Sequence, residues 1–454
     1  MTKNLAEGSP FKLIVGFSFP LLLGNLFQQF YSIVDTVIVG KFLGVENLAA
    51  VGSTGAINFL IVGFCIGVGN GFSLPIAHKF GAKDYKTLRQ YVASSAQLSV
   101  VVAIVITVLT VIFCRPLLRI MQTPSNIIEQ ADSYIRIIFA GIPVLFMYNL
   151  LAGIIRSLGD SKTPVVFLII SSVLNIILDL LFIAVFNTGI AGAALATVIS
   201  QLVSGLLCLV YMQKHFEILH LSKDDWKIRT QHYYVLSSMG FPMGLQYSIT
   251  AIGSVILQSA VNTLGSDAVA SVAAAIKISM FFSCPFDALG STMATYGGQN
   301  TGAQKLERLN SGILVSSLLG AVYALLAFGV LLFWGRNLGI LFMDSSETVI
   351  LNNMAHFLHV QALFYIPLAF VNIFRFMIQG MGFSNLAVFA GVFELLGRAV
   401  VAIGFIPIWG FNAVCFASPV AWILADCFLV PAFLKSVKKL IKRQNGEIAT
   451  YKIK

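Results

Sequence analysis

Long apolar runs alternate with short polar segments along almost the whole chain. A helix needs about 20 mostly apolar residues to cross a bilayer. Runs of that size predict membrane spans at 13–38, 52–77, 92–114, 133–155, 164–186, 190–212, 234–261, 270–296, 312–334, 354–378, 385–406 and 411–434. We therefore expect an all-α polytopic membrane protein with twelve transmembrane helices.

The composition supports this interpretation. Of 454 residues, 57% are hydrophobic and 11% are charged, and the mean hydropathy is +0.88. Soluble domains average about 25% charged residues. No small-residue cleavage site follows the first apolar run, so we expect that run to be a retained span rather than a signal peptide.

The net charge of +10 is distributed in a way that favours a membrane protein over a nucleic-acid binder. Most basic residues lie in every second loop and in the C-terminal tail, whereas the other loops hold only Lys41, Arg115, Arg119 and Arg336. By the positive-inside rule, both termini are expected in the cytoplasm. We expect a multi-pass protein of the plasma membrane, with no nucleic-acid partner and from a prokaryotic source.

The two halves of the chain repeat each other at an offset of 221 or 222 residues. Phe19-Pro20 matches Phe241-Pro242, Leu43-Gly44 matches Leu264-Gly265, and Gly81-Ala82 matches Gly302-Ala303. Because each half has an even number of spans, the halves have parallel topology. The repeat predicts one six-helix bundle over 1–213, a cytoplasmic linker over 214–233, a second bundle over 234–436 and a basic tail over 437–454.

One acid, Asp35, lies inside the first apolar run. A carboxylate within a membrane span is costly and is a functional-site hypothesis by default. Gln28, Tyr31 and Asp35 share one helical face because they recur every three or four residues. The alternative is an acid near the helix end that points into the interface.

A second group of polar residues lies in the fifth and sixth spans. Asn175 and Asp179 are one helical turn apart, and Thr197 follows on a helix rich in Gly and Ala. Their oxygens would suit Na⁺, or two nearby acids could share one proton. The alternative is a hydrogen bond that only holds helices together.

The second half lacks these acids. Its first span carries a neutral polar stripe, either the wall of a wet cavity or a packing seam: Gln246, Thr250, Ser254, Gln258 and Asn262. Glu394 and Arg398 stand four residues apart, in the favourable order for a pair, and we interpret them as a structural ion pair.

The sequence contains few motifs that would indicate an enzyme. The sequence has no Walker motif, and the six cysteines have no metal-type spacing. His356 and His359 alone are too few for a zinc site. We expect no enzymatic activity, no cofactor and no metal other than a transported Na⁺.

These residues together resemble the multidrug and toxic compound extrusion (MATE) transporters over nearly the whole chain. The resemblance rests on Phe19-Pro20, Asp35 with Gly40 and Leu43-Gly44, Gly81-Ala82, Gly159-Asp160, the stretch 174–179, and Gly192-Ala193-Ala194 with Thr197. It implies an N-lobe and a C-lobe that form a V around a central cavity.

The resemblance implies antiport, in which cationic or amphiphilic organic compounds leave as H⁺ or Na⁺ enters. It places the cation site in the N-lobe, at Asp35, Asn175, Asp179 and Thr197. Some branches of the family place a cation site in the C-lobe with an acid on the seventh span, and this chain has no acid there. Candidates for the wall of the substrate cavity are Gln28, Tyr31, Met147, Tyr148, Gln246, Ser254, Gln258 and Phe282. We expect a monomer.

Two other functions are open at this point. A flippase for a lipid-linked or anionic substrate of the same superfamily would need cations inside the spans, and the second half offers Lys277, Arg375 and Arg398. A receptor or structural protein without transport is disfavoured by the repeat and the intramembrane acids.

Overall fold

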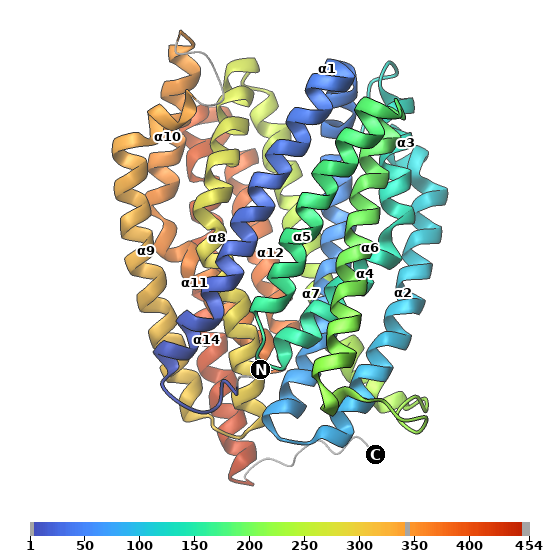
Figure 1. Ribbon diagram of the computed structural model, residues 1–454. Helices are drawn as coiled ribbons and strands as arrows, with labels where there is room; N and C mark the ends of the chain where they lie inside the picture. Colours follow the sequence, from blue (N-terminus) through green and yellow to red (C-terminus); the bar gives the residue numbers. More distant parts are fainter. Residues whose placement is uncertain (1–3, 341–345, 447–454) are drawn as a thin grey trace. The chain divides into compact units, whose positions relative to one another are not determined.

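The computed structural model describes residues 4–340 and 346–446, which form helices and connecting turns without any strand (Figure 1). The first half contains α1 (Pro10–Gly81), α2 (Tyr85–Ile120), α3 (Ile128–Ala140), α4 (Ile142–Ser157), α5 (Lys162–Asp179), η1 (Leu180–Val185), α6 (Ile190–His215) and η2 (Glu217–Leu219). The second contains α7 (Thr230–Asn262), α8 (Ser266–Gly302), α9 (Glu307–Gly339), α10 (Thr348–Leu363), α11 (Tyr365–Gly380), α12 (Ser384–Val400), η3 (Val401–Phe405), α13 (Ile406–Trp409) and α14 (Phe411–Gln444).

These helices confirm the predicted all-α membrane architecture. Within the described ranges, 10 helical segments are long and apolar enough to cross a bilayer, or up to 12 if each of two bent pairs is one span. The bent pairs are α3 with α4, at 45°, and α10 with α11, at 53°. They occupy the fourth and tenth predicted spans, so the bends also follow the repeat.

The Leu-Gly motif of the repeat marks a turn between the first two spans of each half. Gly44 interrupts α1 with φ 83° and ψ 177°, and Gly265 precedes α8 with φ 93° and ψ 174°. Residues with a Cβ rarely adopt this conformation, whereas glycine adopts it without steric cost. The backbone therefore explains why the two halves share glycine at this place.

Replacing Gly265 with alanine should destabilise the protein through the backbone alone, because an added Cβ would meet nothing within 4 Å. We expect a loss of about 1–3 kcal/mol in the free energy of unfolding, measured as a lower thermal midpoint in detergent. Gly329→Ala is the matched control, since Gly329 also has open space but lies inside α9 without a positive φ. An unchanged midpoint for Gly265→Ala would contradict the backbone explanation.

The contacts divide the chain into two compact units, close to the predicted lobes but with other boundaries. Among the described residues, unit 1 comprises residues 4 and 23–244, and unit 2 comprises 5–22, 245–340 and 346–446. The beginning of α1 thus belongs with the second half, and the beginning of α7 belongs with the first. Hydrophobic periodicity cannot reveal this exchange, because it assigns a whole helix to its neighbours in sequence.

Specific hydrogen bonds hold the N-terminal segment within unit 2. The backbone N–H of Leu5 donates to Oε1 of the fully buried Gln299 at 2.7 Å, and the side-chain amide of Asn300 donates to the carbonyl of Leu5 at 3.3 Å. Lys305 and Arg308 donate to the carbonyls of Ala6 and Gly8, each at 2.9 Å. These contacts fix the segment that precedes α1.

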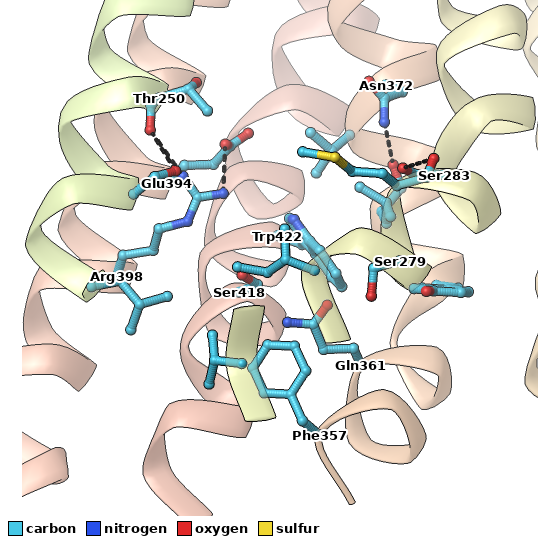
Figure 2. A pocket seen from close by; sticks show the side chains of 18 of the residues that line it. Thr250, Ser279, Ser283, Phe357, Gln361, Asn372, Glu394, Arg398, Ser418 and Trp422 are labelled. Atoms are coloured by element: carbon cyan, nitrogen blue, oxygen red, sulfur yellow. Dashed lines mark hydrogen bonds and ion pairs between the residues drawn. The ribbon is translucent and has the colours of Figure 1, made fainter. Parts of the chain in front are cut away.

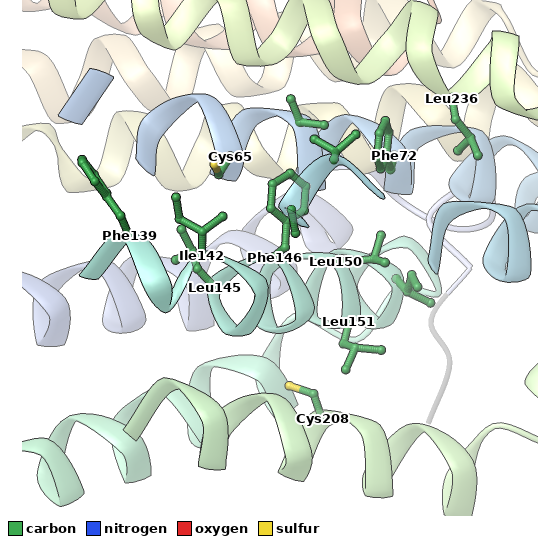
Figure 3. Close-up of a cluster of buried hydrophobic side chains, with 14 of the residues drawn as sticks. Cys65, Phe72, Phe139, Ile142, Leu145, Phe146, Leu150, Leu151, Cys208 and Leu236 are labelled. Carbon is green, nitrogen blue, oxygen red and sulfur yellow. The ribbon is translucent and has the colours of Figure 1, made fainter. Parts of the chain in front are cut away.

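The core of unit 1 includes buried side chains of α3 and α4. Phe139, Ile142 and Phe146 are completely or almost completely buried and belong to one continuous hydrophobic cluster (Figure 3). Cys65 and Cys208 are fully buried in the same cluster. Of the six cysteines, five are buried and Cys427 is exposed.

The outer surface of the bundle helices is apolar, as a lipid-facing surface must be. On α9, Leu314, Leu318 and Leu325 are 63–71% exposed, and all three share one face by their spacing of four and seven residues. Exposed apolar rows of this length are unusual on soluble monomers. The protein is therefore a multi-pass membrane protein.

The predicted linker makes specific contacts with unit 1, and part of the predicted tail is helical. Asp225 is buried, accepts from the backbone and hydroxyl of Ser222, and lies 3.5 Å from the guanidinium of Arg89. Gln97 on α2 also donates to the carbonyl of Trp226. The linker thus packs on unit 1. α14 continues into the predicted tail as far as Gln444, and residues 447–454 of the tail lie outside the described residues.

Candidate functional site

Unit 1 brings together the four residues that the sequence predicted as a cation site. The carboxyl of Asp35 on α1 lies near enough to Asp179, at the end of α5, for the two to interact electrostatically. One turn earlier, the side-chain amide of Asn175 donates to the hydroxyl of Thr197 on α6 at 3.4 Å. Three helices from different parts of the first half therefore contribute to one polar cluster.

Four buried oxygens of this cluster lack hydrogen-bond donors. Asp179 is fully buried, and neither of its carboxylate oxygens accepts a hydrogen bond. One oxygen of Asp35 and the amide oxygen of Asn175 are also buried without a donor. Two ionised carboxylates cannot bond to each other, since both only accept. A proton on one acid, or a cation between them, would satisfy the cluster.

Two tyrosines complete the surroundings. Tyr31 lies beside Thr197, and both Tyr31 and Tyr134 on α3 are near enough to Asp35 and Asp179 to interact with them electrostatically. The predicted set assigned Tyr31 to the substrate cavity and omitted Tyr134. The sequence did hold one signal for it, a hydroxyl-bearing side chain inside a predicted span, but nothing in its spacing points to Asp35.

The backbone changes its winding directly after Asp179. The π-helical turn η1 starts at Leu180, and the repeat places a second such turn, η3, at Val401. Turns of this kind are rare and often occur at functional sites. The wider turn follows the last acid of the cluster.

Unit 2 contains a separate polar cavity of about 400 Å³ (Figure 2). It lies among α7, α8, α10, α11, α12 and α14, and its lining includes Thr250, Asp287, Arg375, Glu394 and Arg398. Figure 2 shows Arg398 and Glu394 on one side of this cavity, with Trp422 and Gln361 across from them. The cavity wall thus carries both signs of charge.

The predicted Glu394–Arg398 ion pair is present but is part of a larger cluster. Nη2 of Arg398 lies 3.7 Å from Oε2 of Glu394, while Arg375 on α11 makes a shorter contact with Oε1 of the same carboxylate. All three side chains are less than 10% exposed. Spacing along one helix revealed the first pair, whereas Arg375 comes from another helix and was not predicted as its partner.

The predicted polar stripe of α7 divides between cavity and packing. Thr250, Ser254 and Gln258 line the cavity of unit 2. Gln246 is 4% exposed and instead accepts a hydrogen bond from Gln379 on α11. Both alternatives considered for this stripe therefore apply, each to a different part of it.

The remaining substrate-cavity candidates have varied surroundings. Met147 and Tyr148 pack against the core of unit 1, and Met147 lies against Gly205 of α6. The carbonyl of Phe282 accepts from Tyr323 at 3.1 Å, and the side chain of Gln28 is exposed. Their role in substrate binding stays a prediction.

No group of three or more His, Cys, Asp or Glu residues within the described ranges could hold a metal ion. The two neighbouring histidines have separate partners. His356 bonds to the side chain of Asn412, and His359 bonds to the carbonyl of Leu331.

Comparison with known proteins agrees with this architecture. A profile of the MatE family matches residues 20–181 and again residues 242–403. The two matches are displaced by 222 residues, which is the offset of the repeat found in the sequence.

Individual relatives and structures point the same way. The chain is 31% identical to the probable multidrug resistance protein YoeA of Bacillus subtilis, over 77% of each chain, and 26% identical to an FAD transporter of Shewanella oneidensis, over 80% of each chain. A solved outward-facing structure of a multidrug resistance MATE family transporter matches with a TM-score of 0.90 and 25% identity, covering 97% of this chain and 99% of that one. The chain therefore belongs to the MatE family of multidrug transporters and is a membrane transporter rather than an enzyme.

Proposed function

We propose that this protein exports cationic or amphiphilic organic compounds in exchange for H⁺ or Na⁺, with the cation site at Asp35, Asn175, Asp179 and Thr197. The observation that carries the proposal is the fully buried Asp179, with no donor to either carboxylate oxygen, beside the half-buried Asp35, which has one buried oxygen without a donor. Such a pair is unfavourable when both acids are ionised and empty, so it favours uptake of a positive charge.

The exchange follows from competition for this negative charge. An outgoing organic cation is attracted while both acids are ionised. Entry of H⁺ or Na⁺ neutralises part of that charge and removes the attraction. Secondary transporters built from two repeats expose a central site alternately to the two sides of the membrane, because one repeat moves against the other.

The coupling ion is the first property to test. In proteoliposomes that contain the purified protein, ethidium flux should respond to a Na⁺ gradient alone or to a pH gradient alone. If neither gradient changes the ethidium flux, antiport at this site is contradicted. Liposomes with Asp179→Asn protein, which lacks the proposed charge, serve as the matched control.

A second candidate, export of an anionic compound, is favoured by two observations. The cavity of unit 2 is lined by Arg375 and Arg398, and the relative from Shewanella is named for transport of FAD, a phosphate-bearing molecule. Arginine suits phosphate and carboxylate groups well. Competition of ethidium flux by FAD would support this candidate, and flux insensitive to FAD would favour organic cations.

The protein is further proposed to reside as a monomer in the cytoplasmic membrane with both termini inside. The bacterial origin of the relatives supports the cytoplasmic membrane as the location. The positively charged loops support the orientation with both termini inside. A protease added to right-side-out vesicles should then leave the C-terminus intact.

A further inference from the structure

A second cavity in unit 2 lies at the end of the bundle where α12 begins and α14 approaches its C-terminus. It has a volume of about 530 Å³ and is lined by apolar side chains and two lysines. The apolar wall includes Phe383, Leu386 and Phe428, and the lysines are Lys435 and Lys439. None of these residues belongs to the cavity with Arg398 or to the acid cluster of unit 1.

The charge of this cavity is positive without compensation. Lys435 and Lys439 are exposed, and no acid in the described residues pairs with either. The neighbouring stretches 376–393 and 427–444 contain no Asp or Glu at all. The ammonium of Lys439 lies 5.7 Å from the ring centroid of Phe383, which places it over the cavity wall. An anionic group at this mouth would meet two cations.

The arrangement of charge and apolar surface is that of an amphiphile's binding site. Lys435 directly follows the apolar part of α14, and Phe428 lies two turns deeper on the same helix. Seven helical residues correspond to roughly 10 Å along the axis. A phosphate at the lysines would therefore continue into acyl chains beside Phe428 and Leu386, whereas free phosphate would leave the apolar wall unused.

The corresponding turn of unit 1, after α4, has different side chains from the turn of unit 2 that lines this cavity. Gly159 and Gly382 both adopt φ 89° at the same turn of the repeat. The next residue is Asp160 in unit 1, where it accepts hydrogen bonds from Thr163 and Tyr211, but Phe383 in unit 2. At this turn the repeat thus exchanges an acid with internal partners for an aromatic ring that lines a cavity with two lysines.

We propose that this cavity binds an anionic phospholipid of the surrounding leaflet, with the phosphate at Lys435 and Lys439 and an acyl chain along Phe383, Leu386 and Phe428. Basic pockets between membrane helices bind anionic head groups in this way, and each lysine near the surface contributes measurably to the attraction. The volume suits a head group with its glycerol and the beginning of the chains.

Native mass spectrometry of the full-length protein in detergent tests this site. The fraction of protein that retains phosphatidylglycerol should be at least about fivefold larger than the fraction that retains phosphatidylcholine. The double variant Lys435→Gln/Lys439→Gln should lower the affinity for phosphatidylglycerol roughly tenfold. The control Lys86→Gln/Lys223→Gln removes two exposed lysines of unit 1 and should keep the wild-type preference. Equal binding of the two lipids, or an unchanged preference in the first variant, would overturn the proposal.

Two further measurements identify the source of the anion. Cys427 lines the cavity and is the exposed cysteine of the chain, so phosphatidylglycerol should slow its reaction with a methanethiosulfonate reagent severalfold. Millimolar inorganic phosphate should neither protect Cys427 nor displace the lipid. If inorganic phosphate alone protects Cys427 from the reagent, the site binds a free anion rather than a lipid, and the proposal is overturned.

Discussion

Asp179→Asn protein should fold normally and transport roughly 10- to 100-fold less ethidium than the wild type, the range expected when a coupling interaction between two ligands is removed. Asp179 is fully buried and both of its carboxylate oxygens lack donors. The amide has the same shape but carries no charge that H⁺ or Na⁺ could neutralise. Asp35→Asn should have an effect of similar size, because the two carboxyls interact electrostatically.

The double variant separates a shared site from two independent ones. If Asp35 and Asp179 act as a unit, the double substitution should cost about as much transport as either single one, since effects within one interacting group are not additive. Thermal unfolding in detergent supplies the second readout. Loss of a buried charge without donors should leave the midpoint equal or higher, so a loss of flux cannot be attributed to unfolding.

The matched control is Asp224→Asn. This acid is exposed in the linker and forms a surface ion pair with Lys227. Its loss should leave both flux and stability nearly unchanged, because such pairs contribute little. Wild-type flux in both Asp35→Asn and Asp179→Asn would refute the proposed cation site.

Much of this fold could be predicted because lipid imposes a simple rule on the sequence. Every span needs a long apolar run, and each predicted run corresponds to a helix or to a bent pair of helices. The repeat was also visible, since turns that require glycine, such as Gly44 and Gly265, leave a signature in both halves. The predicted acid cluster likewise used residues that are rare inside membranes.

The parts that could not be predicted depend on contacts between distant segments. Tyr134 and Arg375 are ordinary residues of their own helices, and only packing brings them to Asp35 and Glu394. The segment that precedes α1 is held in unit 2 by buried amides, Gln299 and Asn300, whose partner Leu5 lies almost 300 positions earlier. Periodicity describes the face of a helix but not which neighbour covers it.

Glu394→Gln should destabilise the protein strongly. The carboxylate lies between Arg375 and Arg398, and all three side chains are nearly buried. The amide would leave two buried guanidinium groups without a negative partner on this side of the cavity. Removing one member of a buried ion cluster typically costs about 3–5 kcal/mol, and we expect a correspondingly lower thermal midpoint in detergent.

The neutral triple variant Arg375→Met/Glu394→Gln/Arg398→Met distinguishes an unpaired charge from a misfit of shape. With both guanidinium groups removed, the midpoint should return most of the way to the wild-type value, because replacing a whole buried ion cluster by side chains of similar volume is often neutral or stabilising. If the triple variant is as unstable as Glu394→Gln, the cost comes from lost packing instead. If Glu394→Gln itself is as stable as the wild type, then Asp287, which lines the same cavity, and Asp426, which interacts with Arg375, already balance the arginines, and Glu394 is not the group that neutralises them.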